Sequence, residues 1–151
     1  MLNQGPKPPK PQEFAESVAQ SDGYELAAAQ TALAQSRHPQ VRAFAQQMIA
    51  DHEHVEQALR EATKASGLQL PHPQVGGDQA RLLAGLQGLR GDEFDREYGR
   101  QQMLVHTSAL TVVRSYAQKG SDANLRSMAA STAPIIERHL QAARELQQAL
   151  S

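Results

Sequence analysis

The chain has 151 residues, and its 15 basic and 16 acidic side chains give a formal net charge of −1. A charge so close to zero argues against a nucleic-acid-binding protein, which needs a basic surface. The chain has no cysteine, which excludes disulfides and zinc–thiolate sites. Valine and isoleucine together number only 10, too few for a protein built from β-sheets, and no apolar run approaches the roughly 20 residues that cross a bilayer.

Proline and glycine divide the chain into predicted elements. Residues 1–11 contain four prolines, and we expect them to form a flexible tail of the kind that often follows a cleaved signal or lipid anchor. Residues 12–150 are expected to form a single domain. Helices are predicted over 12–36, 39–66, 78–89, 92–119 and from 121 or 122 to 149.

Capping residues support these boundaries. Pro39 stands where the first turn of a helix tolerates proline. Asp78 and Asp92 are expected to cap the helices that they open, and Ser121 or Asp122 to cap the last one. Pro134 falls inside the last helix and is expected to kink it. Four long helices and one short one predict an all-α antiparallel four-helix bundle, whose longer middle connection permits either a simple or a crossover path.

Each long helix places one potential metal ligand within its apolar stripe. On a helical wheel these ligands are Glu25, His52, His106 and His139. The first two are predicted to lie at the same height, whereas the last two differ by about 6 Å along the helix axis. Three imidazoles and one carboxylate would satisfy one another through a divalent Zn, Fe, Mn or Cu ion. The alternative is that the histidines are core residues hydrogen-bonded to polar neighbours.

Three further residues are candidates for orienting these ligands. They are Asp51, Asp95 and Tyr98, which border the same helix faces. His54 is expected to point outward into solvent. The sequence contains no phosphate-binding loop, dinucleotide-binding glycine pattern, HExxH or GxSxG motif, so it favours a non-enzymatic role.

Several segments together resemble the bacterial domain-of-unknown-function family 4142. The run FAQQMIADH at residues 44–52 is similar to the signature of that family. Residues 91–106 and the segment from Pro134 to Leu140 also fit its pattern, as do Phe14 and residues 23–26. The resemblance covers roughly residues 12–148. It implies a ferritin-like four-helix bundle and export to the periplasm or cell envelope, because many members carry signal peptides.

The sequence departs from the ligand pattern of the wider ferritin-like superfamily, which uses Glu-x-x-His on two helices. Isoleucine stands three residues before His52 and three residues before His139. Of the expected carboxylates only Glu25 remains, which disfavours a redox enzyme with a di-iron centre. Two hypotheses remain: an exported bundle that binds one divalent metal, and a metal-free structural or interaction protein of the envelope. A second copy of the chain or an envelope protein is the expected partner.

Overall fold

The computed structural model describes residues 7–72 and 74–151, and over these residues its secondary structure consists of helices and their connections, without strands. The helices are α1 (Pro11–Gln35), α2 (Pro39–Ala65), α3 (Gly77–Gln87), α4 (Gly91–Lys119) and α5 (Ala123–Leu150). The expected tail falls partly on residues 1–6, which lie outside the described residues. None of the described helices combines the length and apolarity needed to cross a membrane.

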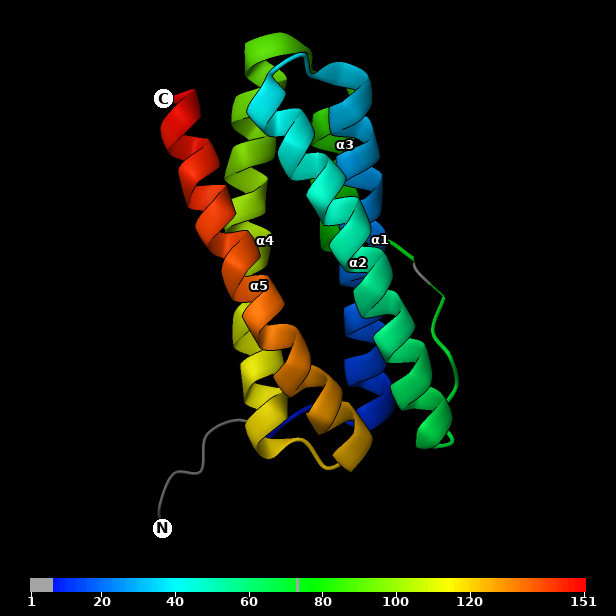
Figure 1. Ribbon diagram of the computed structural model, residues 1–151. Coiled ribbons are helices and arrows are strands. Elements are labelled where there is room, and N and C mark those ends of the chain that lie inside the picture. Colours follow the sequence, from blue (N-terminus) through cyan, green and yellow to red (C-terminus); the bar gives the residue numbers. More distant parts are fainter. Residues whose placement is uncertain (1–6, 73) are drawn as a thin grey trace.

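Four long helices lie side by side, and the short α3 lies against the outside of α1 and α4 (Figure 1). Around this assembly α1 contacts α2, α2 contacts α5, α5 contacts α4, and α4 contacts α1. The colours of Figure 1 show that α2 and α4 run in the same direction, while each helix runs opposite to its two neighbours. The connection from α2 to α4, which contains α3, is therefore a crossover.

The helix ends show which predicted caps form. Asp122 caps α5, since its Oδ1 accepts from the backbone N–H of Leu125 at 2.8 Å. Pro39 opens α2 as predicted. The expected caps at Asp78 and Asp92 were wrong, because both residues lie inside the first turn of their helices, after Gly76 and Arg90. A carboxylate in the first turn is still favourable there, because it faces the positive end of the helix dipole.

The apolar core is divided into two clusters. One cluster packs around Phe14 and Tyr116, whose rings stack with centroids 4.0 Å apart. The other packs around Tyr24, Phe44 and Phe94, together with the buried face of the last two turns of α5. Between these clusters the long helices carry polar side chains instead of apolar ones, so the centre of the molecule is a polar layer.

Glutamine side chains attach α3 to the long helices. The amide of Gln35 on α1 donates to the backbone oxygen of Leu86 at 3.1 Å. The amide of Gln101 on α4 donates to the oxygen of Leu82 at 2.9 Å, and the Gln101 side-chain oxygen accepts from the hydroxyl of Tyr24. Leu86 is fully buried. These contacts hold α3 over one half of the α1–α4 face and leave the other half uncovered.

The close approach of Gly120 to Tyr116 yields a prediction about stability. A Cβ atom at Gly120 would overlap the Tyr116 ring, which is stacked on Phe14 and cannot move freely. We expect Gly120→Ala to lower the free energy of unfolding by about 1–3 kcal/mol, the usual cost of overpacking. Urea denaturation followed by circular dichroism measures this change.

Gly85→Ala is the matched control for that substitution. Gly85 lies inside α3, and a Cβ there would make only one ordinary contact, at 3.9 Å from Gln101 Nε2. We expect Gly85→Ala to be neutral or stabilising by up to about 1 kcal/mol, because alanine favours the helix. Equal destabilisation by the two substitutions would contradict the steric explanation.

Candidate metal centre

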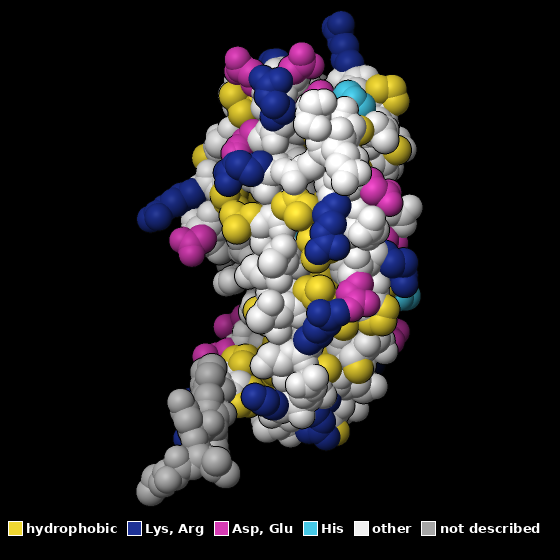
Figure 2. All heavy atoms as spheres, turned by 90° about the vertical axis from the view of Figure 1, so that its left-hand side faces the viewer, with side chains coloured by type: hydrophobic (Ala, Val, Ile, Leu, Met, Phe, Trp, Pro, Cys, Tyr) yellow, Lys and Arg dark blue, Asp and Glu magenta, His cyan; other side chains and the backbone are white. Residues whose placement is uncertain are grey.

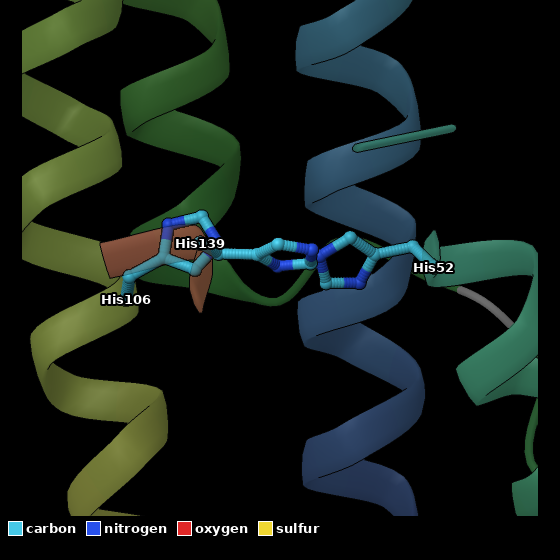
Figure 3. A group of neighbouring side chains, drawn as sticks. All are labelled: His52, His106 and His139. Atoms are coloured by element: carbon cyan, nitrogen blue, oxygen red, sulfur yellow. The ribbon is translucent and has the colours of Figure 1, made fainter. Parts of the chain in front are cut away.

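Three histidines from three different helices meet in the polar layer. Figure 3 shows the rings of His52 on α2, His106 on α4 and His139 on α5 pointing toward one another. Their ligand atoms all lie within 4.8 Å of one another. The three residues are only 5%, 2% and 3% exposed. The helices thus bring three potential nitrogen ligands to one depth in the interior.

Two of the three rings form a hydrogen bond to a carboxylate through one ring nitrogen. His52 Nδ1 lies 2.8 Å from Asp22 Oδ1, and Asp22 is itself buried on α1. His139 Nε2 lies 2.7 Å from Asp51 Oδ2 on α2. A carboxylate behind an imidazole fixes the ring orientation and places the proton on the bonded nitrogen. The opposite nitrogen of each ring is then a lone-pair acceptor.

The third ring is held by the backbone. His106 Nδ1 donates to the carbonyl oxygen of Gln102, one turn earlier on α4, at 2.8 Å. All three rings therefore have one nitrogen engaged and one nitrogen buried without a hydrogen-bond partner. The unpartnered atoms are His52 Nε2, His106 Nε2 and His139 Nδ1. This arrangement of one bonded and one free ring nitrogen is typical of histidines that bind a metal.

Glu25 lies beside the histidine group rather than within it. It is 1% exposed on α1 and lines the same cavity as the three histidines, but it is not among the mutually close ligand atoms. Burial raises the pKa of Glu25 to about 7, against the opposing influence of His52. Its Oε2 atom has no hydrogen-bond partner. A carboxylate with a free oxygen is thus available next to the imidazoles.

The protonation states suit metal binding. Burial lowers the pKa of His106 to about 3, and the neighbouring His139 and His52 act in the same direction. Burial also lowers the pKa of His139, although Asp51 opposes it. Burial disfavours the charged form of His52 as well, but the bond to Asp22 and the charges of Glu25, Asp22 and Asp51 together outweigh it and raise the pKa of His52. Two of the three rings are therefore neutral at pH 7, as a metal ligand must be.

The chain matches the sequence model of a family described as Domain of unknown function (DUF4142) over residues 2–146. The chain belongs to DUF4142. No curated protein and no solved structure matches it. The family match confirms the resemblance to DUF4142 that the sequence motifs indicate. Membership of DUF4142 leaves the biochemical role open. Any role for this DUF4142 protein must therefore be argued from its own residues.

The three residues expected to orient the ligands have different surroundings in this DUF4142 chain. Asp51 contacts His139, as described above. Asp95 is buried and accepts a hydrogen bond from the hydroxyl of Ser36 at the end of α1. The Tyr98 hydroxyl is buried without a partner, and its ring packs edge-on against Phe44 at 5.9 Å. Neither Asp95 nor Tyr98 has a hydrogen bond to a histidine.

Sequence reasoning missed two groups that hold the rings. Asp22 precedes Glu25 by three residues, so it shares the same helix face one turn earlier. That spacing of two carboxylates within an apolar stripe was a usable signal. The carbonyl of Gln102 has no side-chain signature, because every residue offers one. His54 is exposed, as predicted.

The lowered pKa of His106 predicts acid sensitivity in the metal-free protein. The unfolded chain binds a proton at this residue near pH 6.5, whereas the folded chain does so only near pH 3. Below pH 6.5 the unfolded state binds more protons, so this residue reduces stability as the pH falls. The loss is at most about 1.4 kcal/mol per pH unit.

Urea denaturation at pH 7 and pH 5, in the presence of a chelator, tests this prediction. When the pH falls from 7 to 5, wild type should lose about 1–2 kcal/mol more of its free energy of unfolding than His106→Leu does, because the variant lacks the titrating ring. His54→Leu removes an exposed histidine from α2 and should leave the pH dependence unchanged. A pH dependence of His106→Leu identical to that of wild type would contradict the assigned burial.

Proposed function

We propose that this protein binds one divalent transition-metal ion per chain through His52, His106 and His139. The observation that carries the proposal is the meeting of three buried rings, each with one ring nitrogen that has no hydrogen-bond partner. The opposite nitrogens are held by Asp22, the Gln102 carbonyl and Asp51. In this proposal Glu25, which lines the same cavity, would supply a fourth ligand or accept a proton from a bound water.

The physical argument concerns buried lone pairs. A buried polar atom without a partner costs about 1–3 kcal/mol. A proton placed between the rings could serve only one pair of nitrogens. A divalent ion accepts all three lone pairs at once, so it removes the whole penalty.

The spacing of the nitrogens is compatible with such an ion. Tetrahedral coordination with metal–nitrogen distances of about 2.0–2.1 Å places ligand nitrogens roughly 3.3 Å apart. The ligand atoms all lie within 4.8 Å of one another, so rotation of the rings about their side-chain torsions has to shorten the longest separation by no more than about 1.5 Å. Three imidazoles with one open position suit zinc, copper, iron or manganese, and zinc is the first probe because it is not redox-active.

Two finer features belong to the same proposal. We infer that the four long helices form a ferritin-like bundle, which the antiparallel neighbours and the single crossover support. We also infer that the protein works outside the cytoplasm, in the periplasm or cell envelope, on the basis of its family. Fractionation of cells that express the native gene tests the location, and recovery only in the cytoplasm would refute it.

Metal titration tests the central proposal. Protein purified without a polyhistidine tag and treated with chelator should bind one equivalent of Zn²⁺ or Co²⁺ and gain thermal stability, because the ion binds only the folded state. His106→Ala should lose most of this affinity, and the exposed His54→Ala is the matched control that should keep it. A thermal stability that does not change on addition of zinc, copper, iron or manganese would overturn the proposal and favour a metal-free structural role.

The carboxylate behind His139 gives a second prediction. Asp51→Asn keeps the shape of the side chain but removes its charge, so the ring is oriented less strongly. We expect the zinc affinity to fall by about 10–100-fold, as for other residues that orient metal-binding histidines. Asp95→Asn is the control, because Asp95 contacts Ser36 and not a histidine. Equal effects of the two substitutions would argue against the assigned role of Asp51.

A further inference from the structure

A cavity of about 420 Å³ opens next to the histidines. Its walls come mainly from α1, α4 and α5, and the start of α3 lies over one side. Figure 2 shows that the molecule is hollowed at mid-height along the edge that corresponds to the back of Figure 1, where α3 begins. This is the half of the α1–α4 face that α3 leaves uncovered. The cavity therefore connects the histidine group with the surface.

The walls of the cavity are mostly apolar. Val18, Val55 and Ile136 line its interior and are nearly fully buried. Leu104 and Val112 on α4 also belong to the lining, and they are 51% and 37% exposed. Large apolar side chains exposed at the mouth of a pocket are typical of a site that binds an apolar molecule.

The buried titratable side chains of the lining gather around the histidine group, whereas serine and glutamine side chains and Asp78 line other parts of the cavity. These buried titratable side chains are Asp22, Glu25 and the three histidines, and none of the lining residues is lysine or arginine. A negatively charged ligand would thus find carboxylates and no cation of the protein to pair with. A neutral nitrogen or hydroxyl group carries no such penalty and can coordinate a metal.

We propose that this cavity binds a small, mainly apolar molecule whose single polar end is a neutral metal-coordinating group, such as an azole nitrogen or an alcohol. The proposal rests on the metal site proposed above, because that ion would take the polar end of the ligand. The volume lies within the usual range for ligand pockets, roughly 300–1,000 Å³. Such a volume accommodates a small molecule and excludes a folded partner.

A homologous series of 1-alkylimidazoles tests the proposal on the full chain. Zinc-loaded protein is titrated calorimetrically with 1-methyl-, 1-butyl- and 1-hexylimidazole, whose coordinating group is constant while the apolar chain lengthens. Each buried methylene should tighten binding by up to about fourfold. We expect 1-butylimidazole to bind at least tenfold more tightly than 1-methylimidazole. An affinity independent of chain length overturns the proposal.

Substitutions in the wall separate the cavity from the metal site. Ala109→Phe places a ring in the lining of the cavity and should abolish the preference for long chains while zinc still binds. Ser115→Phe adds the same ring to an exposed position of α4 outside the lining and should change neither property. Ser21→Phe on the opposite wall replaces Ala109→Phe if that variant fails to fold.

The outcomes distinguish the two proposals. If zinc itself fails to bind, the proposed function is overturned, and this inference falls with it. If zinc binds but the alkyl chain contributes nothing, or Ala109→Phe retains the preference for long chains, only the cavity proposal is overturned. If zinc binds and chain length matters in wild type and Ser115→Phe but not in Ala109→Phe, both proposals are supported.

Discussion

The structure depends on one constraint: three imidazoles must be buried at one depth, close together, each with one ring nitrogen that lacks a hydrogen-bond partner. His52, His106 and His139 come from three helices, and each helix must place its residue at the same height. This layer separates the apolar cluster around Phe14 and Tyr116 from the other cluster. Because apolar packing alone favours one continuous core, the polar layer is a cost that the fold retains for its chemistry.

The fold was largely predictable because its signals are local. Pro39 and Asp122 mark helix starts because proline favours the backbone geometry of the first helical position and aspartate favours the capping hydrogen bond. Both preferences depend on residue type, so they can be recognised in the sequence. The direction of the middle connection was not predictable, since residues 66–90 are long enough for either path. The predicted caps at Asp78 and Asp92 were wrong because a carboxylate is favourable both at the N-cap and in the first turn of a helix. Residue type alone does not distinguish these positions.

The candidate site was predictable only in part, for a related reason. The helical wheel identified the face of each histidine, and the structure brings together the three rings. The expected difference of about 6 Å between His106 and His139 did not keep them apart, because helix tilt and the separate starts of α4 and α5 set the heights, and residue counting includes neither. Asp22 was overlooked because its partner His52 lies on another helix.

The charges of the layer connect the proposed metal site with the cavity. Asp22 and Asp51 each accept from an imidazole, and the bonds from His139 and Gln47 outweigh burial and lower the pKa of Asp51. These two carboxylates bring negative charge next to the rings, although burial raises the pKa of Asp22 and the bond to Asp22 helps to raise the pKa of His52. A divalent ion would balance that negative charge. Glu25 adds less than one further negative charge near pH 7, because burial raises its pKa to about 7. A layer balanced by a bound divalent ion would have no excess charge to attract an ionic ligand, and most of the cavity wall beside it is apolar. The same arrangement that favours a divalent ion thus favours a neutral molecule beside it.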